Sequence, residues 1–200
     1  MTRRPALPEL RLRLPDWVER MLPPRGQALG DVTARMRFAV ELARQNVERG
    51  TGGPFAAAVF DGESGRLVAP GVNLVVPARW SGAHAEIVAC ALAQQVLGHH
   101  DLGSAGMPSC ELVSSAEPCA MCLGAVPWSG VRRVVCGARE EDARAVGFDE
   151  GPKPADWVLE LARRGIEVIR DVERDAAREV LRGYARRGGP IYNGRGGRPA

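Results

Sequence analysis

Two short motifs, far apart in the chain, restrict its fold more than any other feature of the sequence. The first is His84-Ala85-Glu86 and the second is Pro118-Cys119-Ala120-Met121-Cys122. Imidazole and thiolate groups are typical zinc ligands, and a site with three protein ligands leaves one position open for water. The sequence therefore predicts a fold in which His84, Cys119 and Cys122 meet at one catalytic Zn²⁺ ion per subunit.

The spacing of the first motif predicts where a helix begins. Residues two apart point away from each other on a helix, so His84 and Glu86 can share a site only if His84 lies at the helix start. Apolar residues recur at helical intervals over 85–97, which indicates a buried helix there. We therefore expect His84 at its first turn.

The second motif also fits a helix start. Pro118 suits the first helical position, and Cys119 and Cys122, three residues apart, then lie on one face. The positive end of the helix lowers the thiol pKa, so that both cysteines can bind as anions. Two thiolates and a neutral imidazole cancel the charge of Zn²⁺ and leave it a weak acidifier of its water. Glu86 is therefore the expected proton acceptor.

The combined H-x-E and P-C-x-x-C pattern is the signature of zinc-dependent base deaminases. The segments 117–125, Trp128, 147–150, 52–55 and Asn73 extend the match, and over about residues 31 to 150 the chain resembles the bacterial guanine deaminases of the cytidine-deaminase-like superfamily. The resemblance implies a three-layer α/β/α sandwich, a homodimer, and a C-terminal segment that can cross to cap the partner's site.

Hydrophobic periodicity predicts alternating helices and strands. The expected elements are a helix over 32–47 capped by Asp31, a hairpin of strands at 55–60 and 67–76, helices over 85–97 and from Cys119, strands at 111–114, 131–137 and 166–169, and helices over 156–162 and 172–187. The strands before and after the Cys119 helix are expected to be parallel. This order predicts an α/β fold, an α/β/α sandwich with a mixed central sheet.

Length and composition favour one domain with two appended segments. The chain has 200 residues and 45% hydrophobic content, enough for one sizeable core. We expect a Pro/Arg-rich arm over 1–30 that adds nothing to the core, the deaminase domain over 31–187, and a tail over 188–200. Five cysteines, two of them assigned to the metal, form no disulfide framework, which predicts a cytoplasmic protein.

The charge pattern argues against a nucleic-acid partner. The net charge is +3, and the 27 basic residues, of which Lys153 is the only lysine, are interspersed with 24 acidic ones. No apolar run reaches the length that a membrane requires. The expected partners are a small-molecule base or nucleoside and a second copy of the chain.

The expected reaction is hydrolytic removal of an exocyclic amine from a heteroaromatic base. The side-chain amide of Asn73 and the backbone N–H of Ala85 are expected to orient the base. Trp128 and Phe55 are expected to wall or stack it, and core packing is an equally good interpretation of Phe55.

Glu150 is the second expected catalytic residue. The resemblance to guanine deaminases implies an Asp at this position that handles the amine or a proton, and Glu150 is one methylene longer. The favoured reaction is guanine to xanthine plus ammonia. A transfer-RNA adenosine deaminase, a cytosine or nucleoside deaminase, and a non-catalytic zinc-stabilised module remain alternatives, although an intact Glu86 argues against the last.

Overall fold

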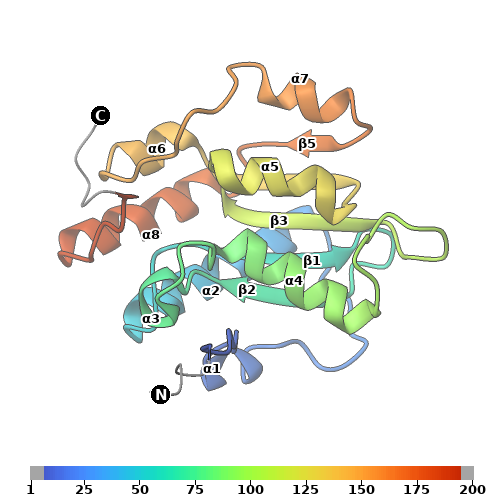
Figure 1. Ribbon diagram of the computed structural model, residues 1–200, viewed down its shortest axis with the longest axis horizontal. Coiled ribbons are helices and arrows are strands. Elements are labelled where there is room, and N and C mark those ends of the chain that lie inside the picture. The colour runs from blue at the N-terminus through green and yellow to red at the C-terminus, as the bar shows by residue number, and fades with distance from the viewer. Residues whose placement is uncertain (1–6, 195–200) are drawn as a thin grey trace, which may run out of the picture.

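A mixed five-stranded sheet forms the centre of the protein (Figure 1). The structure is a computed structural model that describes residues 7–194. The strands are β1 (Ala56–Asp61), β2 (Leu67–Val72), β3 (Cys110–Ala116), β4 (Arg133–Ala138) and β5 (Glu167–Ile169), in the order β2-β1-β3-β4-β5. β1 pairs antiparallel with β2 and β3, whereas β3–β4 and β4–β5 are parallel. The predicted mixed sheet and the parallel pair around the Cys119 helix are confirmed.

Helices cover both faces of this sheet, as the predicted sandwich requires. They are α1 (Asp16–Glu19), α2 (Val32–Glu48), α3 (Val75–Ala78), α4 (Ala85–Leu97), α5 (Ala120–Ser129), α6 (Glu140–Arg144), α7 (Trp157–Ala162) and α8 (Arg174–Arg186). α2 and α8 pack mainly on one face, and α4, α5 and α7 on the other. Figure 1 shows α4 and α5 in front of the sheet and α2 behind it. None of the described helices is long and apolar enough to cross a membrane.

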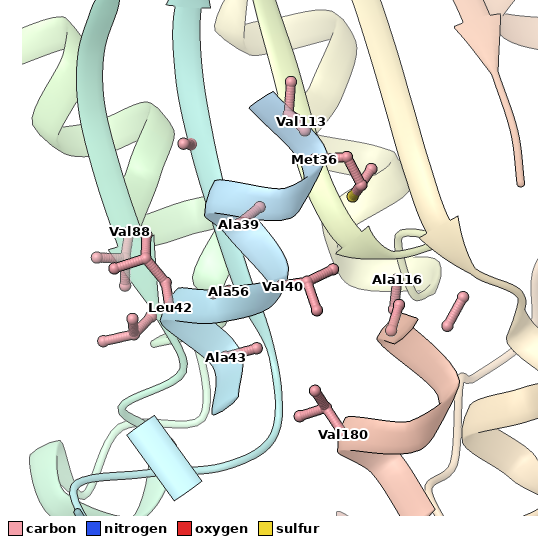
Figure 2. Close-up of a cluster of buried hydrophobic side chains, with 14 of the residues drawn as sticks. Met36, Ala39, Val40, Leu42, Ala43, Ala56, Val88, Val113, Ala116 and Val180 are labelled. Atoms are coloured by element: carbon pink, nitrogen blue, oxygen red, sulfur yellow. The ribbon is translucent and has the colours of Figure 1, made fainter. Parts of the chain in front are cut away.

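The two faces of the sheet carry separate hydrophobic clusters. Side chains alternate along β1, so that Ala58 and Phe60 join the cluster under α2 while Ala57 and Val59 join the one under α4. Figure 2 shows side chains of α2, the sheet and α8 gathered in the first cluster. Met36 on α2 is fully buried there, and burial of a side chain of this size stabilises the fold by roughly 2 kcal/mol.

One glycine sets how closely α4 approaches the sheet. Gly71 on β2 lies against the first turns of α4, where a Cβ atom would clash with the backbone oxygen of Ala85 and the backbone nitrogen of Ala89. Only glycine leaves room for this contact. The end of α4 that carries the first motif is therefore pressed directly onto the sheet.

The expected second strand of the hairpin is too long. β2 ends at Val72, and Val75–Ala78 forms the short helix α3. The side chain of Asn73 accepts a hydrogen bond from the backbone N–H of Val75 at 3.3 Å, a local turn that competes with a strand. Pro77 lacks an N–H for a sheet and is tolerated in a first helical turn.

The N-terminal arm contributes to the core, which contradicts the expectation that it adds nothing. Trp17 and Val18 on α1 are buried in the cluster under α2. The indole N–H of Trp17 donates to the hydroxyl of Thr51 at 3.0 Å. The alternating leucines before α1 do not have helical spacing, and for this reason the short helix that follows them was not predicted. Residues 1–6 of the arm and 195–200 of the tail lie outside the described residues, and the division of the chain at 30 and 187 stays a prediction.

Candidate active site

Two helix N-termini meet at the edge where β2 and β3 end. His84 is the N-cap residue of α4 and Cys119 is the N-cap residue of α5, both with extended backbone. The expected helix start at His84 is therefore confirmed. Pro118 precedes the N-cap and does not occupy the first helical position, which corrects the expected boundary by two residues. Cys122 then lies in the first turn of α5.

The three expected metal ligands converge. The Sγ atoms of Cys119 and Cys122 lie 3.4 and 3.5 Å from Nδ1 of His84, and all three ligand atoms lie within 4.8 Å of one another. Ligand atoms at the usual distances from a tetrahedral zinc ion are roughly 3.5 Å apart. The donor set and its spacing therefore fit one zinc ion with three protein ligands.

The electrostatics of the two thiols also call for a cation. Hydrogen bonds from Cys122 and His84 lower the pKa of Cys119 to about 4. The pKa of Cys122 is raised, because the Cys119 sulfur, burial and the negative charge of Glu86 all disfavour a second anion. A divalent cation removes this penalty, because a metal-bound thiol is deprotonated outright.

A cavity of about 360 Å³ opens beside these ligands and contains Glu86, Glu150 and Asn73 in its lining. Burial, and then the charge of Cys119, raise the pKa of Glu86 to about 6. The same two causes, followed by the charge of Glu86, raise the pKa of Glu150 to about 8. The backbone oxygen of Glu150 accepts a hydrogen bond from the N–H of Ala120 at 2.8 Å, which holds this segment against the start of α5.

Asn73 is fixed by its backbone and presents its side chain to the cavity. Its backbone oxygen accepts from Nδ2 of Asn46 at 2.9 Å, and its N–H donates to the oxygen of Phe55 at 2.9 Å. The side-chain oxygen of Asn73 already accepts from Val75. Among the described residues its amide NH₂ group has no acceptor within hydrogen-bond distance, and it is the half of the amide that can donate to a ligand.

Of the two aromatic residues expected to wall the cavity, Phe55 lines it and Trp128 does not. Phe55 lines the cavity and packs edge-on against Phe148, with ring centroids 4.9 Å apart. Trp128 lies outside this cavity and is 85% exposed. It follows Cys119 by nine residues, about 2.5 helical turns, which places it on the opposite side of α5. Ala85 is fully buried and begins α4 between His84 and Glu86, but the cavity lining does not include it.

The C-terminal tail supplies cavity residues to its own chain, whereas the resemblance implies a segment that crosses to cap the partner's site, and that crossing stays a prediction. Tyr192 and Asn193 line the cavity of their own chain. Asn193 accepts from the N–H of Asp149 and donates to the oxygen of Gly147, both at 2.9 Å. The hydroxyl of Tyr192 is buried without a hydrogen-bond partner among the described residues. The tail has no hydrophobic periodicity, so its place in the cavity lining is known only from these contacts.

Comparison with known proteins places this arrangement in a family. Residues 31–138 match the cytidine and deoxycytidylate deaminase zinc-binding region. The guanine deaminase of Bacillus subtilis (strain 168) is 39% identical over 115 residues, which cover 58% of this chain and 69% of that protein. A probable cytosine deaminase of Schizosaccharomyces pombe is 30% identical over 149 residues, 72% of this chain and 86% of that one.

The solved structures include a still more similar protein. The structure of guanine deaminase from Nitrosomonas europaea is 50% identical, covers 89% of this chain and 97% of its own, and superimposes with a TM-score of 0.85. The chain thus belongs to the cytidine and deoxycytidylate deaminase zinc-binding family. The Bacillus subtilis protein and the Nitrosomonas europaea structure are both named guanine deaminase.

The ligand assignment predicts the effect of removing one sulfur. Cys122→Ala leaves two ligands, so the purified variant should hold less than a tenth of the zinc of the wild type, measured as metal per chain by elemental analysis. Cys90→Ala is the matched control, because Cys90 is a free cysteine of α4 outside the ligand group, and it should keep about one zinc per chain. A full equivalent of zinc in Cys122→Ala would remove that residue from the site.

Proposed function

We propose that this protein hydrolyses guanine to xanthine and ammonia. The observation that carries the proposal is a single cavity that combines a three-ligand zinc site with two buried carboxyl groups, Glu86 and Glu150. Similarity to two proteins named guanine deaminase, at 39% and 50% identity, supports guanine as the base. The cytosine deaminase alternative has weaker support, at 30% identity.

His84, Cys119 and Cys122 would hold the zinc ion, which would supply a bound water molecule polarised for attack. Glu86 accepts the proton of this water and delivers it to the ring nitrogen beside the amine-bearing carbon. A pKa of about 6 suits this exchange, because the carboxylate is present at neutral pH and gains and loses a proton readily.

Glu150 serves the leaving group in this proposal. With a pKa of about 8, its carboxyl group holds a proton at neutral pH and donates it to the amine nitrogen. The water oxygen forms the new bond to carbon, the carbon–nitrogen bond breaks, and ammonia leaves with that proton, while Glu86 accepts the remaining hydroxyl proton as the carbonyl group of xanthine forms. Glu86 then loses its proton to solvent, and Glu150 regains one.

The remaining contacts orient the base. The NH₂ group of Asn73 donates to a ring or carbonyl acceptor, and Phe55 and Phe148 form an apolar wall. The N–H of Ala85, at the positive end of α4, remains a proposed donor. Tyr192 also lines the cavity, and its hydroxyl has no hydrogen-bond partner among residues 7–194. Trp128 lies outside the cavity and has no part in this proposal.

The two carboxyl roles predict separable kinetic effects. Glu86→Gln should lower kcat at least 100-fold, the low end of what a positioned acid–base group contributes, with zinc retained.

Glu150→Gln should lower kcat far more than it raises KM. Because Glu150 acts in its protonated form, the wild-type rate should fall as pH rises above about 8, and this fall should be absent from Glu150→Gln. An unchanged kcat in Glu150→Gln would remove Glu150 from the mechanism.

A substrate panel tests the choice of base. Ammonia release should be fastest with guanine among free purines, pyrimidines, their nucleosides and aminotriazines. Salt-sensitive binding of a transfer-RNA anticodon stem-loop without free-base activity would instead favour a transfer-RNA adenosine deaminase. Preferred turnover of cytosine or cytidine would favour the pyrimidine alternative.

We also propose a homodimer that covers the exposed side of α5. Met121 and Trp128 are 42% and 85% exposed there, and Trp128 borders a second cavity of about 430 Å³ together with Leu123 and Trp157. Contiguous exposed apolar groups of this kind mark interaction surfaces. The five free cysteines support a reducing compartment, the cytosol.

Mass measurement by light scattering tests the dimer. The wild type should have twice the mass of one chain, and Trp128→Glu should be a monomer because the carboxylate cannot be buried unpaired. Leu10→Glu is the control, since Leu10 is 65% exposed in the arm, and it should stay dimeric. A monomeric wild type would contradict the proposal.

A further inference from the structure

The single lysine of the chain is buried beside the candidate active site. Lys153 follows Glu150 by three residues, and its side chain is only 2% exposed. Its Nζ atom donates to a carboxylate oxygen of Glu140 at 2.8 Å and to the backbone oxygen of Pro118 at 3.2 Å. It also lies 3.6 Å from a carboxylate oxygen of Glu117. Two of these partners, Glu117 and Pro118, belong to the segment that leads into Cys119, and Glu140 begins α6.

This arrangement suits lysine and not the arginine used elsewhere in the chain. A compact ammonium group directs three N–H bonds toward separate acceptors, whereas a guanidinium group is planar and larger. Burying an ammonium group is costly unless charge and hydrogen bonds compensate it. Glu117, Glu140 and the oxygen of Pro118 provide that compensation. The face of Trp157 lies 4.9 Å from the ammonium group and adds a cation–π contact.

Lys153 completes a two-point connection between two segments of the site. One point is the hydrogen bond from the N–H of Ala120 to the oxygen of Glu150 at 2.8 Å. The other is the bond from Lys153 to the oxygen of Pro118. Pro118 and Ala120 flank Cys119, while Glu150 and Lys153 bound the opposing segment. Two contacts fix both the separation and the relative rotation of the segments, which one contact cannot do.

The Cys119 side of this connection is itself rigidly held. Glu117 is 4% exposed, and one of its carboxylate oxygens accepts from Nε of Arg170 at 2.6 Å. Its other oxygen accepts from the backbone N–H of Glu140 at 3.1 Å. Its own N–H donates to the oxygen of Ala138 at the end of β4. Lys153 therefore ties the Glu150 segment to a fixed part of the fold.

We propose that Lys153 is a positioning residue that sets where the Glu150 carboxyl group lies relative to the metal ligand Cys119. The inference rests on the proposed function in so far as Glu150 handles a proton of the substrate. Lys153 does not line the cavity. It acts through the backbone of Pro118 and through the segment from Glu150.

The test compares two zinc-loaded variants. Lys153→Met removes the ammonium group and keeps an unbranched apolar side chain. Arg170→Met is the matched control, because Arg170 also pairs with Glu117 and lies over the Trp157 ring but has no hydrogen bond to Pro118. Lys153→Met should lower kcat for guanine about 100-fold with KM within about threefold of the wild type, the loss expected from a misplacement of about 1 Å. Arg170→Met should lower kcat less than about threefold, because the connection to Pro118 remains.

A second readout needs no substrate. Cobalt(II) replaces zinc in sites of this kind, and its visible absorption depends on the geometry of the thiolate ligands. The spectrum of cobalt-loaded Lys153→Met should shift from that of the wild type, and the spectrum of Arg170→Met should not. If Lys153 had a purely structural role, both variants would have a lower melting temperature, and their cobalt spectra would not differ from each other.

Each outcome decides between the two roles. Equal losses of kcat in both variants, or wild-type kcat and spectrum in Lys153→Met, would overturn the proposal. If Lys153→Met does not fold, Lys153→Arg carries the test: it restores the charge opposite Glu117 and Glu140 but not the compact donor, and wild-type kcat in it would overturn the proposal. If the wild type releases no ammonia from guanine, the proposed function fails, and the cobalt spectra still decide the role of Lys153.

Discussion

The site depends on concentrating negative charge on buried groups. Cys119, Glu86 and Glu150 all border one cavity, with Cys122 beside Cys119 in the ligand group, and burial together with mutual repulsion raises the pKa of both carboxyl groups. Such a cluster is unstable unless a cation neutralises part of it. The zinc ion that the ligand geometry fits does so, and the positive ends of α4 and α5 add to its effect. Binding of the metal and proton transfer are therefore two results of one electrostatic arrangement.

The sequence predicted those parts of the site that follow from local geometry. The spacing of His84 and Glu86 requires a helix start, and the structure has one there. The parallel pairing of β3 and β4 follows from the helix between them, because parallel strands need a crossover. Asp31 was expected to cap α2, and its side chain accepts from the N–H of Ala34 at 2.9 Å. Each of these depends on residues close together in the chain.

The parts that the sequence did not predict depend on contacts between distant residues or on helical phase. Asn193 reaches Asp149 and Gly147 across the fold, and no periodicity in the tail signals this contact. Trp128 was expected to wall or stack the base, but its phase on α5 turns it outward. The burial of Lys153 was also hidden, because a lone charged residue in a Pro-rich segment resembles a solvent-exposed one.

The close packing at Gly71 determines how the two halves of the site can move. With no side chain to separate them, β2 and the first turns of α4 touch backbone to backbone, so α4 can shift only together with the sheet. His84 and Glu86 lie at that end of α4, whereas Cys119 and Cys122 lie at the start of α5. A methyl group at position 71 would push this end of α4 off β2 and so change the distances from the His84 imidazole to the two sulfurs.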